Sequence, residues 1–229
     1  MASRDPERTR SHLLEAAATE FAAHGYAGAR VARIAHKARA NQRMVYHYFG
    51  SKEGLYEATY LRLDEEMIRR LGPIIDRLEA EPLEGFADGV RRYFDLVRQL
   101  PNYSRLFVGE TLERKRRLRY ELTSRDPGFQ LIPRLMPLLE RGRASGHLSD
   151  QADAMLALMM GFVFALMYPL MADRLAAFYK AVGFGRGDPD AQVREQLVKV
   201  LLHGIAGPKA KPAGGGLLGS PPARRRTRK

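Results

Sequence analysis

Residues 30–56 of this 229-residue chain read RVARIAHKARANQRMVYHYFGSKEGLY. The helical spacing of apolar residues in this stretch breaks at residues 38–40. After the break, Asn41 offers a side-chain oxygen that can cap a short helix ending near His47. Before the break, apolar side chains at helical spacing predict a short helix over residues 31–37: Val31, Ile34 and Ala35. Two short helices joined by a tight turn are typical of a helix-turn-helix.

The second short helix carries side chains suited to double-stranded DNA. An α-helix fits the major groove, where its N-terminal side chains meet base edges. Asn41, Gln42 and Arg43 lie at that end, and glutamine can pair with adenine as arginine can with guanine. Val45 and Phe49 can anchor the helix to the domain. The flanking donors for phosphate oxygens are Tyr46, His47, Tyr48 and Lys52.

Simpler explanations exist for parts of this segment. Tyr48 can pack under the following helix, and His47 can be a solvated surface histidine. The whole segment can also be an ordinary helical hairpin with a solvated charged face.

The segment resembles the DNA-binding domain of the TetR family of transcriptional regulators. Residues 45–56 are similar to the family's apolar-Tyr-x-x-Phe-x-Ser-Lys-Glu-x-Leu signature, and about the first 56 residues match. Supporting residues at the family's spacing are Ala16, Ala17, Phe21, Gly25, Ile34 and Ala35. The resemblance implies that Gln42, Arg43 and Met44 face bases. It places further groove or backbone contacts at Arg30, Arg33, Tyr46, His47, Tyr48 and Lys52.

Two positions depart from the family pattern. Arg39 stands where the turn usually holds glycine, and a left-handed backbone is unfavourable for other residues, so we expect this turn to be built differently. Ala29 and Arg30 replace the Ser or Thr that often caps the first short helix, so a phosphate contact is lost unless Arg30 replaces it electrostatically.

The rest of the chain predicts an all-α fold, because helical periodicity recurs and strand signals are nearly missing. A first helix should start at Asp5 and Pro6 and end before Gly25. A longer helix should start at Ser51 and stop at Gly72–Pro73. Further helices are expected over residues 74–80, 83–99, 103–120, 128–143, 151–171 and 189–205.

Charge divides the chain into three parts. The formal net charge of +12 comprises +4 in residues 1–56, +1 in 57–205 and +7 in 206–229. We therefore predict a three-helix DNA-binding domain (1–56), a larger helical ligand-binding and dimerisation domain (57–206) and a disordered basic tail (207–229). The alternative is a charge-driven nucleic-acid-binding protein without a small-molecule inducer.

The nearly neutral middle part suits a ligand and a second subunit. The aromatic side chains that are candidates for lining a pocket are Phe86, Tyr93, Tyr103, Phe107, Phe129 and Phe162. The helices at 151–171 and 189–205 are the candidates for dimerisation, since two half-sites on DNA require two-fold pairing. By the resemblance, an unknown effector would tilt the helix at 51–71 and release a repressor from a palindromic operator.

Other functional classes lack their characteristic residues. Cysteine is absent, the histidines show no i, i+4 pair for a metal, and the glycines at 183–187 do not form a phosphate-binding loop, so we expect no enzyme, metal or cofactor. Residues 154–172 carry no charge and are long enough for a membrane span, but Gly161, Pro169 and acidic flanks favour a buried or interface helix. We expect a cytoplasmic protein without a membrane partner.

Overall fold

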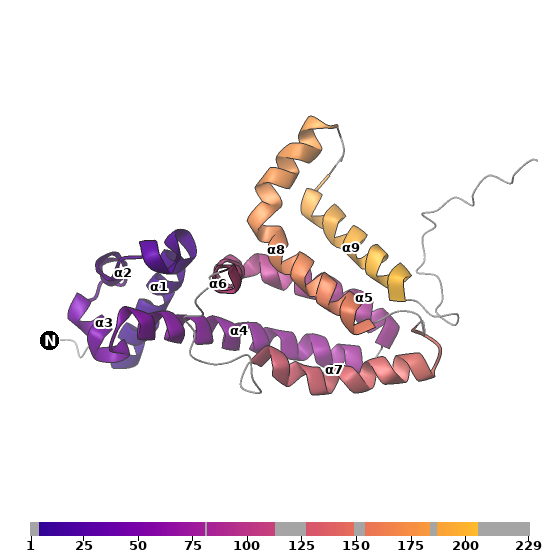
Figure 1. Cartoon of the computed structure of the whole chain (residues 1–229), viewed down its shortest axis with the longest axis horizontal. Coiled ribbons are helices and arrows are strands. Elements are labelled where there is room, and N and C mark those ends of the chain that lie inside the picture. Colours follow the sequence, from indigo (N-terminus) through magenta and orange to yellow (C-terminus); the bar gives the residue numbers. More distant parts are fainter. Residues whose placement is uncertain (1–4, 81, 113–126, 149–153, 184–186, 206–229) are drawn as a thin grey trace, which may run out of the picture.

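The computed structural model describes residues 5–80, 82–112, 127–148, 154–183 and 187–205. Within these ranges the regular elements are all α-helices, which confirms the predicted fold class (Figure 1). The helices are α1 (Pro6–Gly28), α2 (Val31–Lys37), α3 (Gln42–Phe49), α4 (Lys52–Ala80), α5 (Pro82–Gln99), α6 (Pro101–Leu112), α7 (Pro127–Ala144), α8 (Ala154–Ala181) and α9 (Pro189–Ile205).

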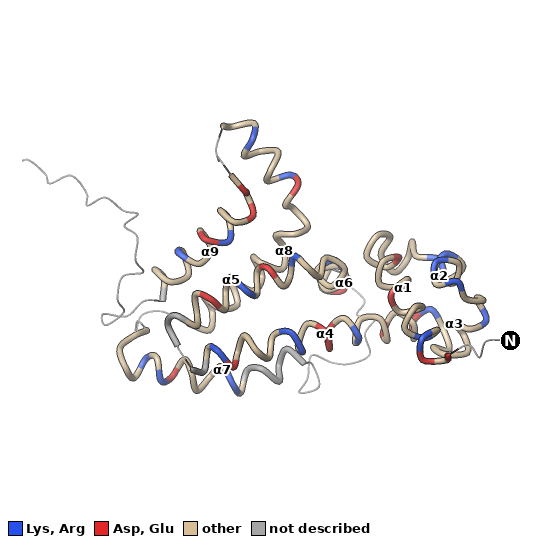
Figure 2. The backbone as a smooth tube through the Cα atoms, turned by 180° about the vertical axis from the view of Figure 1, so that it is seen from behind, with Lys and Arg blue, Asp and Glu red and all other residues tan. Residues whose placement is uncertain are grey.

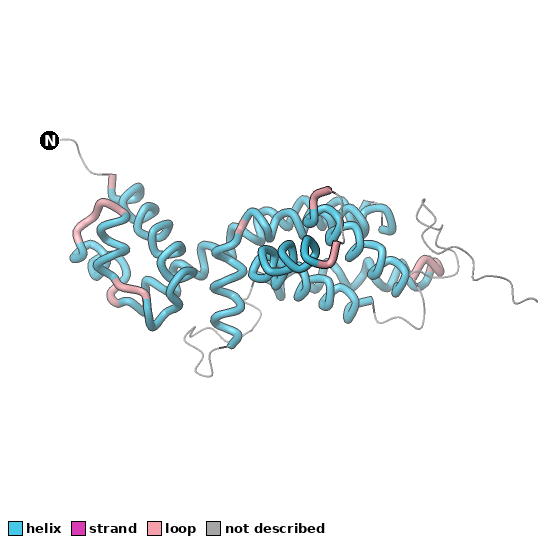
Figure 3. The backbone as a smooth tube through the Cα atoms, turned by 90° about the horizontal axis from the view of Figure 1, so that it is seen from above, coloured by secondary structure: helices cyan, strands magenta, loops and turns pink. Residues whose placement is uncertain are grey.

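The molecule is elongated, with a small domain at one end and a larger body at the other (Figure 3). Helices α1–α3 form the small domain, and the 29-residue α4 runs from it into the body, where it packs on α5 and α7 (Figure 1). Helix α6 lies between α1 and α8 and contacts both. The domain boundary predicted at residue 56 falls inside α4, so one continuous helix joins the two parts.

Two predicted helix ends are wrong. Helix α4 does not stop at Gly72–Pro73 but continues to Ala80, and α8 does not end at residue 171 but continues to Ala181. A proline removes one backbone donor and is unfavourable inside a helix, but packing on both sides can outweigh this. Met67 and Ile75, which flank Pro73, are both buried.

Smaller differences concern α1 and α6. The helical geometry of α1 breaks at Gly25, with φ of 63°, and one further turn follows to Gly28. Helix α6 starts at Pro101, two residues before the prediction. Residues 113–120 and 151–153 of two predicted helices, and the whole predicted tail 207–229, lie outside the described residues.

Helix α8 is apolar but largely uncovered by the rest of its own chain. Among the described residues, Met155–Ala181 is the one helix long and apolar enough to span a membrane, with a mean hydropathy of 2.0, and 22% of the window that meets this criterion is buried. Its most exposed apolar side chains include Leu156, Met159, Met160 and Val163, each at least 53% exposed. The expectation of a helix buried on all sides is therefore not met within one chain.

Candidate DNA-binding site

The small domain is held by a continuous apolar core that α1, α2, α3, α4 and α6 share. Leu13, Ile34, Val45 and Leu55 are completely buried in it. On the first turn of α1, the Asp5 side chain accepts hydrogen bonds from the backbone N–H groups of Glu7 and Arg8, as the sequence predicts. The core fixes the angle between α2 and α3, because each short helix contributes one apolar face to it.

A buried carboxylate joins α1 to the start of α2. Glu20 Oε1 accepts a hydrogen bond from the backbone N–H of Arg30 at 3.0 Å and one from Arg33 Nε at 2.6 Å. Burial opposes ionisation and is the largest single influence on Glu20, but the hydrogen bonds from Arg33 and Arg30 and the Arg33 charge outweigh it, so the pKa lies below its ordinary value. The N-terminus of α2 is thus held by a side chain of α1.

The turn before α3 keeps the left-handed conformation despite its arginine. Arg39 has φ of 52°, so the expectation of a differently built turn is wrong. The backbone N–H groups of Arg39 and Ala40 donate to the carbonyls of His36 and Ala35, and these bonds stabilise the turn. Asn41 Oδ1 then accepts a hydrogen bond from the backbone N–H of Arg43 at 2.9 Å, which confirms the predicted cap.

The joint between α3 and α4 is built from glycines and a serine cap. Gly50 ends α3 with φ of 72°, and Ser51 Oγ accepts a hydrogen bond from the backbone N–H of Gly54 at 3.0 Å. A Cβ atom at Gly54 would lie only 2.2 Å from the carbonyl oxygen of Phe49. Glycine at this position therefore lets the two helices meet at their observed angle.

The exposed face of α3 carries most of the candidate DNA contacts. Gln42, Arg43, Tyr46 and His47 are exposed, while Val45 on the opposite face is completely buried. The exposed Asn41 precedes them at the helix N-terminus, where the helix dipole favours phosphate. Figure 2 shows Lys and Arg positions around α2 and α3 at this end of the molecule.

Four other candidates are less free to reach DNA. Met44 and Tyr48 are half-buried and pack against the core of the small domain. Arg33 is tied to Glu20 and also donates to the carbonyl of Gly28 at 2.9 Å. Lys52 Nζ lies 4.7 Å from the centroid of the Tyr26 ring. Arg30 is exposed, although its backbone N–H bonds Glu20.

Sequence reasoning missed three residues that shape this site: Glu20, Tyr26 and Arg10. Tyr26 packs edge-on against Tyr56 at 5.3 Å and carries the Lys52 ammonium on its face. The Arg10 guanidinium lies 5.5 Å from the centroid of the Phe49 ring. A glutamate among alanines on the apolar face of α1 was a signal for Glu20.

The candidate ligand-pocket residues do not all come together. Tyr93 of α5, Phe162 of α8, and Phe107 and Tyr103 of α6 form a connected row with ring centroids 5.3–6.1 Å apart. We call these four side chains the aromatic row. Phe86 lies in a different core cluster with Leu138 and Leu139, and the side chain of Phe129 lies outside the described residues.

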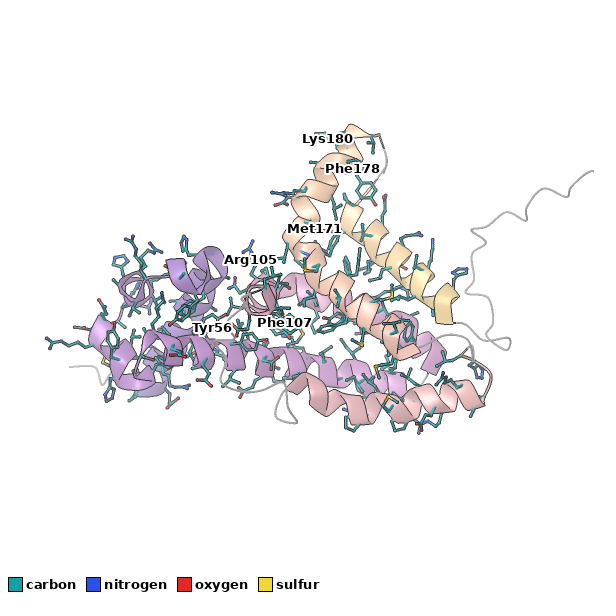
Figure 4. All side chains as sticks on the ribbon, in the orientation of Figure 1. Tyr56, Arg105, Phe107, Met171, Phe178 and Lys180 are labelled. Atoms are coloured by element: carbon teal, nitrogen blue, oxygen red, sulfur yellow. The ribbon has the colours of Figure 1, made fainter. Side chains whose placement is uncertain are left out.

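Helix α6 connects the aromatic row with the small domain. Phe107 packs against the cores of both parts, and Leu106 is buried in the core of the small domain. The Tyr56 hydroxyl on α4 donates a hydrogen bond to Glu110 Oε2 on α6 at 3.1 Å, and both side chains are buried. Tyr56 and Phe107 are labelled where α6 meets α4 in Figure 4.

The two dimerisation candidates lie side by side. Helices α8 and α9 pack together, and Gly161 allows close approach because a Cβ there would lie 2.7 Å from Leu201 Cδ1. Exposed apolar side chains on this pair include Met160 at 63% and Val200 at 59%. Figure 2 shows that α8 carries charge only in its C-terminal part.

Family models match both the small domain and the body of this chain. Residues 13–59 match the model for bacterial regulatory proteins of the tetR family, and residues 82–200 match a tetracyclin repressor-like C-terminal domain. The HTH-type transcriptional repressor SCO4008 of Streptomyces coelicolor is 39% identical over 49% of this chain and 55% of its own length. The repressor NicS of Pseudomonas putida is 28% identical over 63% of this chain and 68% of its own. The chain therefore spans about half the length of the first relative.

Solved structures share the fold. The protein SCO4942 of Streptomyces coelicolor has a TM-score of 0.63 and 27% identity, and the match covers 87% of this chain and 99% of that one. The regulator FadR of Bacillus subtilis, solved with stearoyl-CoA, has a TM-score of 0.64 and 21% identity, and the match covers 85% and 98%.

Replacing Glu20 by glutamine should destabilise the protein in a pH-dependent way. The free energy of unfolding at pH 7 should fall by about 1–3 kcal/mol, because a charge-assisted buried hydrogen bond is lost. Since the folded pKa of Glu20 is depressed, its stabilisation is present above the unfolded pKa and lost as pH falls through the folded pKa. Urea denaturation at several pH values should show the difference from the wild type shrinking below about pH 4.

The control is Glu15→Gln, whose exposed pair with Arg62 should contribute less than about 1 kcal/mol. A Glu20→Gln effect independent of pH would contradict this account.

Replacing Gly54 by alanine should destabilise the small domain although alanine favours helices. The clash with the Phe49 carbonyl should cost about 1–3 kcal/mol of unfolding free energy. The matched control is Gly72→Ala in the same helix, where a Cβ meets nothing within 4 Å and a gain of up to about 1 kcal/mol is expected. Urea denaturation compares the two variants, and equal effects would show that the α3–α4 joint tolerates a side chain.

Proposed function

The chain belongs to the TetR family of bacterial transcriptional regulators, and from this premise we propose that it is a homodimeric repressor that a small molecule releases from a palindromic operator. The observation that carries the proposal is the exposed face of α3, which presents Gln42 and Arg43 at a capped helix N-terminus while Val45 holds the opposite face in the core. This is the geometry that a helix needs to enter a major groove.

DNA contacts divide by position. Gln42 and Arg43 read base edges, and Tyr46 and His47 bind the flanking backbone. Arg30 reaches phosphate from the start of α2. Arg33 and Lys52 act mainly by holding the domain together, because Glu20 and Tyr26 already engage them.

Dimerisation uses the exposed apolar face of α8 and α9. A two-fold axis through this face pairs two small domains, as reading two half-sites requires. The same pairing covers the large apolar side chains that one chain leaves exposed.

Effector binding in the body reaches DNA through α6 and α4. A ligand that displaces the aromatic row moves Phe107, and the Tyr56–Glu110 hydrogen bond passes that movement to the small domain. Operator affinity then falls because the ligand prefers the conformation that binds DNA less well.

The remaining parts of the proposal rest on the sequence and on the family. Residues 1–56 form the DNA-binding domain and 57–206 the ligand-binding and dimerisation domain, while the basic residues of 207–229 add sequence-independent attraction to DNA. We place the protein in the cytoplasm, without a membrane partner, a cofactor or a catalytic activity. SCO4008 and NicS are transcriptional repressors, which agrees with this assignment.

Selection from fragmented genomic DNA at about 150 mM salt tests the proposal, since salt suppresses nonspecific attraction. Full-length protein and a variant without residues 207–229 should retain the same palindromic site. Retention that is independent of sequence and lost with residues 207–229 would favour the charge-driven alternative.

On the selected site, Arg43→Ala should weaken binding by about 1–3 kcal/mol and relax the preference at one base position in each half-site. The matched control is Arg105→Ala, which removes the same charge from an exposed position on α6 (Figure 4). Fluorescence anisotropy with operator variants measures both. Equal, sequence-independent losses for the two variants would count against base reading by α3.

The double variant Met160→Glu, Val200→Asp should be monomeric. Like charges brought together across a two-fold interface cost several kcal/mol, so the dimer dissociation constant should rise more than about 100-fold. Light scattering after gel filtration measures the mass. The control is Leu112→Asp, which adds charge at a 76% exposed leucine of α6 and should leave the dimer intact. A double variant that remains dimeric would place the interface elsewhere.

A further inference from the structure

Two buried hydroxyl groups in the body are without hydrogen-bond partners in the part of the chain that the structure describes. These are Tyr93 Oη on α5 and Ser104 Oγ on α6. Buried polar groups are almost always paired, so each such group calls for an explanation. By contrast, the hydroxyls of Tyr103 and Tyr168 donate to Asp64 and Asp190.

Both hydroxyls belong to the aromatic row or stand next to it. The Tyr93 ring stacks on Phe162 at 5.3 Å with an interplanar angle of 21°. Ser104 precedes Phe107 by three residues on α6, so the two side chains share one face of that helix. The row therefore offers flat apolar surfaces together with two unused polar atoms.

Three of the four rings of the aromatic row are partly exposed. Tyr93, Phe107 and Phe162 are half-buried, unlike Tyr103 and the neighbouring Val97, which are buried. To reach the buried hydroxyls, a ligand would displace the Phe162 or Phe107 ring.

The electrostatic surroundings disfavour an anionic ligand, because the buried Asp64 carboxylate lies next to the row and accepts a hydrogen bond from Tyr103. Burial raises the pKa of Tyr93 well above its ordinary value, so its phenol remains a neutral donor and acceptor. Two nearby basic side chains are already paired: Arg70 of α4 with Glu66, and Arg91 of α5 with Glu195. Aromatic faces and hydroxyls without a cation give a carboxylate or phosphate no counter-charge.

We propose that the effector is a small, planar aromatic molecule without a negative charge that stacks in the aromatic row and hydrogen-bonds Tyr93 and Ser104 through a neutral oxygen. This inference rests on the proposed function for its regulatory meaning, but the binding itself does not depend on DNA. An aryl ketone or a phenol has this chemistry, because its ring replaces a stacked side chain and its oxygen completes the hydroxyl pairs.

Calorimetric titration of the full-length protein with three probes tests the proposal. Acetophenone should bind, benzoate should bind at least tenfold more weakly because it carries negative charge, and ethylbenzene should bind more weakly because it lacks the oxygen. Equal or tighter binding of benzoate, or of ethylbenzene, would overturn the proposal. Failure of all three to bind would overturn it too.

Variants then locate the site. Tyr93→Phe and Ser104→Ala should each weaken acetophenone binding about three- to tenfold, because each removes one hydrogen bond. The melting temperature of the free protein should not fall, because neither hydroxyl has a partner to lose. The control is Tyr168→Phe, which removes a paired hydroxyl at Asp190 and should lower the melting temperature while leaving acetophenone affinity unchanged. The site is wrong if Tyr93→Phe binds acetophenone as well as the wild type does.

The two levels of the proposal fail separately. Acetophenone that binds through Tyr93 but leaves the operator complex intact would contradict its role as an inducer and keep the binding site. An operator complex that forms normally in a protein that binds none of the probes would keep the regulator and refute the effector class.

Discussion

The candidate DNA-binding surface depends on holding an eight-residue helix that must leave one face free. An isolated helix as short as α3 is unstable in water, and exposing Gln42, Arg43 and Tyr46 leaves it little surface to bury. Completely buried Val45, the Asn41 cap and the close contact at Gly54 supply the missing stability from outside the exposed face. Helix α2 is equally short, and the Glu20 carboxylate of α1 stabilises its N-terminus by accepting a hydrogen bond from the backbone N–H of Arg30.

This dependence makes the small domain sensitive to its support from the body. The core around Val45 includes Leu106 of α6, and the Tyr56 ring that packs on Phe21 at 5.0 Å also donates its hydroxyl to Glu110 of α6. A shift of α6 therefore acts on the same core that sets the angle of α3. Because α4 continues through this junction without a break, the body and the small domain cannot move independently.

The sequence predicts the small domain well because its signals are local. Asp5 and Asn41 cap the helices that follow them, and residues 31–37 form the expected short helix. A proline misleads where packing continues on both sides, as at Pro73, which α4 passes. The hydrogen bond from Arg33 to Glu20 cannot be predicted from local sequence, because it joins residues 13 positions apart on two helices. Similarly, helical spacing alone cannot separate Phe86 from the aromatic row, because only the packing of α5 on α6 and α8 reveals which rings meet.

The apolar length of α8 alone does not distinguish a lipid partner from a protein partner, but charged pairs lie beside it. The Tyr168 hydroxyl donates to Asp190 of α9, which in turn pairs with Arg98 of α5. Beside it, Arg194 of α9 bonds Asp95 of α5 at 2.8–3.0 Å. Charged pairs next to the middle of a helix are costly in hydrocarbon and ordinary at the wet margin of a protein core. In the proposed dimer, the uncovered face of α8 would meet the same face of a second chain, whose methionine side chains can adapt to one another across a two-fold axis.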